Sequence, residues 1–350
     1  MAAQAVHPAA PDATTARLAP AGAAQAVHPA APGAARLLPV AVDGYRPHRL
    51  HTGERVWAET NCYVDLWVEV LHAAGLDPVP AAAVALSADF DGTQWSFLKF
   101  TPEDLRRLYG IEVAELNVWR PVVEHISEEL ARGRLLTVEV DSCWLPDTQG
   151  TDYRQAHTKT TIVVNELDLA AGRMAYFHNA GYHELGGDDL RALLHLDGRA
   201  PELLDPYVEL VRLERAHDVT PDAALALFDT HLARAPGDNP VARLAERVLA
   251  DLDWLSGAGL ETYHRWSFGV LRQCGFTAEL AADVCRHVAD RGVVGAASAA
   301  TEFGAVAEAA KAVQFRVARI ARGRAGDPGP ELTRMVDHWA AATDVLAGPR

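Results

Sequence analysis

Apolar residues recur with two different periods along this chain, and the change of period divides it. Two short runs rich in Val, Ile and Thr, at 160–164 and 173–178, flank a Gly-containing turn at 169–172, which is the signature of a β-hairpin. Residues 135–140 predict another strand. Upstream, apolar residues at i, i+3, i+4, i+7 and i+8 predict a helix over 62–74. This part of the chain therefore predicts an α+β fold.

Further helices are predicted on both sides of the hairpin. Thr101, followed by a proline and two acids, is a good start for a helix over 102–110, and a second helix is predicted over 121–131. Residues 81–100 predict a loop between short strands, or a strand and a turn. Beyond residue 188 helical periodicity dominates and predicts an all-α module. Its segments are 221–234, 240–255, 260–274, 278–291, 302–322 and 331–346.

The N-terminal segment has a different composition from the rest. The decapeptide AAQAVHPAAP occurs at 2–11 and again at 23–32. Its prolines would break a helix and the repeat is too short for a solenoid unit. We therefore expect a disordered tail over 1–40, an α+β domain over 41–215 and an all-α helical module over 216–350.

Charge and cysteine usage exclude several classes of protein. The 350 residues carry a formal net charge of -15 without a long Lys/Arg run, so no nucleic acid partner is expected. An 18-residue apolar window and a secretory signal pattern are both missing, so no membrane association is expected. Four cysteines are too few for a disulfide framework, which favours the cytoplasm. The pattern gives no indication of oligomeric state.

One cysteine has a context that favours chemistry. Cys62 falls in the first turn of the helix predicted over 62–74, with Thr60 or Asn61 as the N-cap. Unpaired amides and the helix dipole at such a position can lower a thiol pKa from about 8.5 to roughly 3.5–7.5. Cys143, at a strand end, is the alternative nucleophile but lacks evident activation. The remaining two, Cys274 and Cys285, are expected in the core.

A base and an orienting group are predicted from the hairpin. His157 precedes its first strand and Asn179 follows its second, and antiparallel pairing brings such ends together. Cys62, His157 and Asn179 thus occur in the order of a Cys-His-Asn site on a papain-like α+β fold, where a helix that carries the Cys packs on an antiparallel sheet. The Cys62 amide would bind the oxyanion, with Asn61 as the second donor.

A metal site is the competing interpretation of the same region. Six potential ligands crowd there: Asp141, Asp147, Asp152, His157, His178 and His183. HxH and HExxH spacings are both missing, which weakens that interpretation. Several of these side chains could instead form loop hydrogen bonds or bind the amine of a substrate. The predicted substrate-binding residues are Asp141, Asp147, Tyr153 and His178.

The sequence resembles a known family at these residues. ETNCYVDLWVEVLHAAGLDP at 59–78 and EVDSCWLPDTQGTDYRQAHTKTTIVVNE at 139–166 are similar to the bacterial family called domain of unknown function 1839. So are AYFHNAGYHEL in the hairpin region and SFGVLRQCGF and AKAVQFRVAR in the helical part. The resemblance runs from about residue 47 to the C-terminus. It implies no activity.

A more distant resemblance implies one. The run Asp141…Leu145-Pro146…Tyr153…His157, with an aromatic strand that ends at Asn179, is similar to the N-terminal domain of the butirosin-type acyltransferases. Those proteins resemble papain-like peptidases and transfer an aminoacyl group from a carrier-protein thioester to an amine. The resemblance implies that Cys62 is the nucleophile and His157 the base. Asn179 stands where that family has Asp, and an amide stabilises imidazolium less than a carboxylate does.

The function expected from these features is a cysteine-dependent acyltransferase. It would move an acyl or aminoacyl group from a thioester, such as phosphopantetheine on an acyl carrier protein, to the amine or hydroxyl of a small-molecule acceptor. It would need no cofactor of its own. An amidase or peptidase with the same site is the first alternative, and a non-catalytic partner-binding module or a metal-dependent hydrolase is the second. A basic patch for a carrier protein could come from Arg106, Arg107, Arg120, Arg132 and Arg134.

Overall fold

The computed structural model describes residues 35–199 and 203–348. Most of the predicted disordered tail, with both copies of the decapeptide, lies outside the described residues. Residues 35–40 were assigned to that tail but belong to the fold. Strand β1 (Ala35–Arg36) pairs with β4, and the amide of buried Leu38 donates to Asn165 Oδ1 at 2.7 Å.

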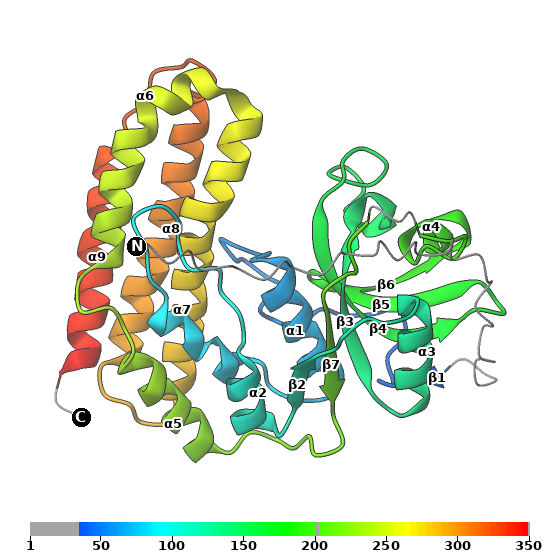
Figure 1. The fold of residues 1–350 in the computed structure, drawn as a ribbon. Coiled ribbons are helices and arrows are strands. Elements are labelled where there is room, and N and C mark those ends of the chain that lie inside the picture. The colour runs from blue at the N-terminus through cyan, green and yellow to red at the C-terminus, as the bar shows by residue number, and fades with distance from the viewer. Residues whose placement is uncertain (1–34, 200–202, 349–350) are drawn as a thin grey trace, which may run out of the picture. The chain divides into compact units, whose positions relative to one another are not determined.

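One antiparallel sheet forms the centre of the N-terminal half (Figure 1). In the described part of the chain it has seven strands, in the order β2-β7-β3-β4-β5-β6, with β1 beside β4. The predicted hairpin is confirmed as β4 and β5, and the predicted strand at 135–140 as β3. The strand bounds are β2 Glu112–Glu115, β3 Leu135–Asp141, β4 Lys159–Asp168, β5 Arg173–His178, β6 Gly181–Gly186 and β7 Val208–Arg212.

Strand β7 lies in a region that showed no strand signal in the sequence. It pairs with β2 on one side and β3 on the other, so the sheet depends on it. The strand is five residues long and its Glu209 is buried with 5 % exposure. A buried carboxylate inside so short an apolar run hides the periodicity by which a strand is detected.

Four helices accompany the sheet among the described residues of the N-terminal half. They are α1 Cys62–Ala73, α2 Pro102–Tyr109, α3 Val122–Ala131 and α4 Gly187–Leu193. The predicted helices at 62–74, 102–110 and 121–131 are confirmed. Helix α1 packs on β4, β5 and β6, and Figure 1 shows it beside the sheet. The fold is therefore α+β, as expected.

The segment predicted as a loop between short strands, 81–100, contains a helix instead. A 3₁₀ helix, η1 (Val79–Ser87), is followed by a single bridge between Phe90 and Trp95. Pro80 stands at the start of η1, where a missing amide hydrogen costs nothing. Small alanines allow η1 to be buried, which overrides the strand and turn signals. Two further 3₁₀ turns, η2 (Ser142–Trp144) and η3 (Pro146–Thr148), follow β3.

The C-terminal half is helical, as predicted. The elements are α5 Pro221–Leu232, α6 Pro240–Ser267, the π-helical turn η4 Phe268–Arg272, α7 Gln273–Ala289, α8 Ala296–Ile320 and α9 Gly329–Ala347. Figure 1 shows α6, α8 and α9 running alongside one another. The predicted break after 255 is a kink at Gly259, where φ is 80°. The break expected after 274 does not occur. Among the described helices, none has the length and apolar character to cross a membrane.

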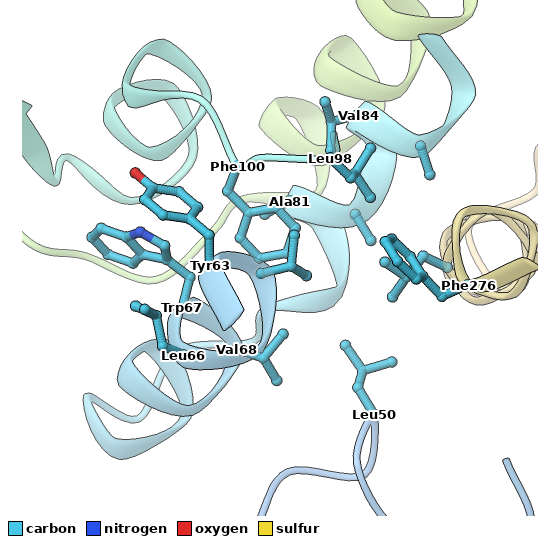
Figure 2. Close-up of a cluster of buried hydrophobic side chains, with 14 of the residues drawn as sticks. Leu50, Tyr63, Leu66, Trp67, Val68, Ala81, Val84, Leu98, Phe100 and Phe276 are labelled. Carbon is cyan, nitrogen blue, oxygen red and sulfur yellow. The ribbon is translucent and has the colours of Figure 1, made fainter. Parts of the chain in front are cut away.

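The two halves share one hydrophobic core. Figure 2 shows Phe276 of α7 in the same cluster as Val84 of η1 and Leu98. Trp57 enters the helical half, where its indole N–H donates to the Ala307 carbonyl at 3.1 Å. Glu279 of α7 accepts from the Trp57 amide at 2.8 Å. The segment that leads to α1 is therefore fixed by the helical half.

Candidate functional site

Cys62 is the first residue of α1, as the sequence predicted, and is partly exposed. Asn61 is the N-cap, since its Oδ1 accepts from the amides of Tyr63 and Val64 at 3.0 and 2.9 Å. Its Nδ2 donates to the Leu98 carbonyl at 3.0 Å. Buried Asn61 therefore shapes the helix start, while the cap leaves the Cys62 amide itself unused.

A buried histidine fixes the residues that precede Cys62. His51 lies between two carboxylates of α1, with Nε2 at 3.1 Å from Asp65 Oδ1 and Nδ1 bonded to Glu69. Burial opposes protonation of His51, but its bonds to Asp65 and Glu69 outweigh burial and raise its pKa to about 9. Asp65 also accepts from the Thr60 amide at 2.9 Å. This network, which the sequence did not reveal, ties the loop to α1.

His157 forms a pair with Asp141 at the end of β3. His157 Nδ1 lies 2.5 Å from Asp141 Oδ2, and its side chain is 74 % exposed. Asp141 Oδ1 accepts from the Cys143 amide at 3.0 Å, which holds the carboxylate in place. The Trp144 ring lies edge-on to the imidazole at 6.4 Å. Because Nδ1 faces the carboxylate, Nε2 is the nitrogen directed away from it and available as a base.

Asn179 lies elsewhere. It occupies the two-residue turn between β5 and β6 with φ of 45°, a conformation that Asn tolerates better than most residues. Val163 pairs with Phe177, so Thr161 is the residue opposite Asn179, and His157 is four residues further along. Among the described residues, no hydrogen bond joins Cys62, His157 and Asn179 to one another. The partner of His157 is Asp141.

The start of α1 and the Asp141 side chain lie on the same face of the sheet. Thr137 and Asp141 share that face because side chains alternate along a strand. Thr137 Oγ1 donates to buried Glu209 at 3.0 Å, and the Tyr63 hydroxyl donates to the same carboxylate at 2.9 Å. The side chain that follows Cys62 therefore reaches the face that carries Asp141. About 13 Å of strand separates Thr137 from Asp141.

His178 and Asp147 form a second pair on the opposite face of the sheet. His178 Nδ1 lies 2.5 Å from Asp147 Oδ2, and Nε2 lies 2.7 Å from Thr160 Oγ1. Asp147 also accepts from the Tyr176 hydroxyl at 2.5 Å. His178 is 1 % exposed and both of its ring nitrogens are engaged. This pair holds η3 against the sheet.

Tyr153 has a structural partner as well. Its hydroxyl donates to Asp189 in the first turn of α4 at 2.8 Å, and Arg154 bonds the same carboxylate. The long loop between η3 and β4 is therefore tethered to α4. His157 lies near the end of that loop, so the bond from Tyr153 to Asp189 helps to fix the position of His157.

The other three cysteines are buried, as was expected of Cys274 and Cys285. Burial raises the pKa of the Cys274 thiol and raises that of Cys285 to about 12. Cys143 is 6 % exposed. Of the four thiols, that of Cys62 is the most accessible.

The predicted metal ligands divide into separate hydrogen-bonded sets. Asp141 pairs with His157, and Asp152 accepts from Ser142 Oγ at 2.7 Å. Asp147 pairs with His178 and has His183 Nε2 at 3.9 Å. Within residues 35–199 and 203–348, no group of three or more His, Cys, Asp or Glu side chains is placed to hold a metal ion.

A shallow hollow lies at the far end of α1 from Cys62. Tyr45, Arg46 and His72 line it. Since α1 has 12 residues and rises 1.5 Å per residue, about 16 Å separates this hollow from Cys62. The hollow is therefore not part of the region around Cys62 and Asp141.

Comparison with protein families matches two domain models to most of the described residues. The model of the DUF1839 N-terminal domain matches residues 46–213, and that of the DUF1839 C-terminal domain matches residues 217–348. A search of curated proteins finds no match. The first match covers strands β2 to β7 with α1 to α4, and the second covers α5 to α9. The chain belongs to the DUF1839 family.

Proposed function

We propose that this protein is a cysteine-dependent acyltransferase with a papain-like arrangement. Cys62 is the nucleophile, His157 the general base and Asp141 the residue that orients His157. The observation that carries this proposal is the 2.5 Å contact between His157 Nδ1 and Asp141 Oδ2 on an exposed imidazole. A base held by a carboxylate, on the sheet that packs against a helix beginning with Cys, has the components of a thiol site.

The two steps follow from these groups. Once Cys62 and His157 come within hydrogen-bond distance, His157 Nε2 takes the thiol proton, and the thiolate attacks the carbonyl carbon of a thioester. The bond from that carbon to the donor sulfur breaks, and His157 returns the proton to the departing thiolate. An amine or hydroxyl then attacks the acyl-enzyme, loses its proton to His157 and releases Cys62. The Cys62 amide supports the developing oxyanion.

Asp141 fits the orienting role better than Asn179 does. A carboxylate fixes the tautomer with a proton on Nδ1 and stabilises the imidazolium that forms in each step. An amide would do only the first. The distant resemblance to the butirosin-type acyltransferases implies an Asp at this role, and Asp141 supplies one from β3 rather than from β5.

Trapping of the acyl-enzyme tests the proposal. The protein is incubated with a short-chain acyl-pantetheine thioester, and its intact mass is measured. We expect one acyl adduct, mapped to the peptide of Cys62 and lost in Cys62→Ala. Cys143→Ala is the matched control and should keep the adduct. An adduct retained by Cys62→Ala would contradict the proposal.

Hydrolysis is the alternative fate of the same acyl-enzyme. If the protein is an amidase or peptidase, water competes successfully at saturating amine, and the acylated amine does not accumulate. The ratio of acylated amine to free acid, measured against amine concentration, separates the two. A non-catalytic module would form no adduct. A metal-dependent hydrolase would lose activity with a chelator and keep it in Cys62→Ala.

The acyl donor is a carrier protein or a free thioester in the cytoplasm. The arginines considered for docking are all neutralised locally, by Glu103, Glu124, Glu128, Glu129 and Glu214. They therefore supply little uncompensated charge for an acidic carrier. We expect comparable acylation rates from free and carrier-bound pantetheine thioesters, compared at equal thioester concentration.

A further inference from the structure

Three side chains from distant parts of the chain form a second relay, away from Cys62. Ser87 ends η1, Asp104 lies in the first turn of α2, and His231 lies in the last turn of α5. Ser87 and Asp104 belong to the N-terminal family domain and His231 to the C-terminal one. The relay therefore exists only where these elements pack together.

Both bonds of a nucleophile–base–orienter set are present. Ser87 Oγ lies 2.8 Å from His231 Nδ1, and His231 Nε2 lies 3.1 Å from Asp104 Oδ2. With the Nε2 proton directed at the carboxylate, Nδ1 is the free acceptor for the Ser87 hydroxyl. The hydroxyl also reaches the Val84 carbonyl at 3.0 Å, so the imidazole is its nearer acceptor.

The three side chains differ in exposure as a catalytic relay requires, with the base and the carboxylate buried and the nucleophile more accessible. The side chains of His231 and Asp104 are 2 % and 3 % exposed, while Ser87 is partly exposed. Burial alone would raise the pKa of Asp104, but the hydrogen bond from His231 and that from Thr101 keep it below its usual range. An ionised, buried carboxylate thus lies behind the base, and the serine that would act as nucleophile is partly exposed.

We propose that Ser87, His231 and Asp104 form a second acyl-transfer centre, which acts on small carboxylic esters. Ser87 Oγ attacks the ester carbonyl carbon and passes its proton to His231 Nδ1. The carbon–alkoxy bond breaks, and His231 protonates the departing alcohol. Water then adds to the acyl-serine, gives a proton to His231, and the carboxylic acid leaves as Ser87 regains the proton. Asp104 stays ionised throughout.

A fluorophosphonate tests the nucleophile directly, since its phosphorus forms a bond to an activated serine and fluoride leaves. Ser127 provides an internal control in the same molecule. It is also partly exposed, and its hydroxyl also donates to a backbone carbonyl, that of Val123 at 2.9 Å, without a neighbouring imidazole in any described contact. Because a general base contributes about 10²–10⁴-fold, we expect the Ser87 peptide to be labelled at least about 10²-fold faster.

Two variants complete the test. Ser87→Ala should abolish labelling of the Ser87 peptide and, compared with Cys62→Ala alone, should abolish the burst of p-nitrophenol from p-nitrophenyl acetate in a Cys62→Ala background. Asp104→Asn should slow labelling while the alkylation rate of Cys62 is unchanged, which separates this centre from the thiol site. Equal labelling rates for Ser87 and Ser127 in the folded wild-type protein would overturn the proposal, whatever the variants do.

Discussion

The carboxylate that is bonded to His157 belongs to Asp141, the last residue of β3. Asp141 pairs with Lys159 across β3 and β4, so the two ends of loop 142–158 lie together, and His157 is close to one of them. Asn179 was expected as the partner because it follows the neighbouring strand. The strand register places Asn179 opposite Thr161 and not His157. A sequence does not specify that register without its pairing partners.

Substitution at Asp141 and Asn179 separates their roles. Asp141→Asn keeps the oxygen that caps η2 but loses the charge, so we expect acylation of Cys62 to slow by about 10²–10⁴-fold. Asn179→Gly keeps the positive φ that the turn requires, and we expect no change. Stopped-flow or quench-flow mass spectrometry gives both rates. A slow Asn179→Gly beside an unaffected Asp141→Asn would restore Asn179 as the orienting residue.

The buried His51 predicts how stability depends on pH. Its folded pKa of about 9 exceeds the unfolded value of about 6.5, so its contribution is complete below pH 6.5 and disappears as pH rises through 9. Linkage gives about 3 kcal/mol for this change. Urea unfolding at pH 6, 7.5 and 9 should show that decline.

His51→Gln is the matched control, because glutamine can keep hydrogen bonds to Asp65 or Glu69 but cannot take up the proton. We expect the variant to be less stable at pH 6 and to lose most of the pH slope between 6.5 and 9. An unchanged slope in His51→Gln would show that another group titrates in that range.

At the scale of elements, long periodic segments could be predicted and short buried ones could not. Helix α1 was recognisable from its apolar face and its cap. Strand β7 and helix η1 were not, because burial by surrounding elements overrides local propensity in short segments. The candidate site divides in the same way: Cys62 depends on a local helix start, whereas Asp141 and the His231 relay depend on tertiary packing.

The junction of α7 with the segment before α1 gives a prediction about packing. Gly275 leaves no room for a methyl group, because an added Cβ would clash with the Trp57 ring. Gly275→Ala should therefore destabilise the protein by about 1–3 kcal/mol, measured by urea unfolding. It should also change the alkylation rate of Cys62, five residues beyond Trp57, under conditions where the protein stays folded.

Gly304→Ala is the matched control in α8. Its added Cβ would meet only Arg286, at 3.9 Å, so we expect a gain of about 0.5–1 kcal/mol from the better helix former. The thiol rate should not change. Equal effects of the two substitutions on stability would show that Trp57 is not held by close packing against α7.

At the scale of the whole molecule, the boundary between the family domains is not a boundary of the core. The sequence pattern changes near residue 215, yet the described residues from 35 onward form one compact unit. Trp95 donates to Thr277 Oγ1 at 3.2 Å and packs edge-on against Trp339. A change of periodicity marks where secondary structure changes, which is not where packing ends.

A single unfolding transition is therefore expected. Far-ultraviolet circular dichroism follows mainly the helical half, whereas tryptophan fluorescence follows both halves, because five of the eight tryptophans, such as Trp67, precede residue 215. The two signals should give the same urea midpoint within error. Two separate midpoints would mean that each half folds alone in spite of the shared core.

The insertion of Trp57 against Gly275 also bears on how this family can diverge. The indole needs the space that the glycine leaves, so the two positions are not free to change one at a time. Relatives that carry a larger residue at the position of Gly275 should carry a smaller one at that of Trp57. Such paired changes, counted across family members, would record in evolution the attachment of the helical half to the segment before Cys62, and chimaeras that join halves from different relatives should fold only when both positions come from the same parent.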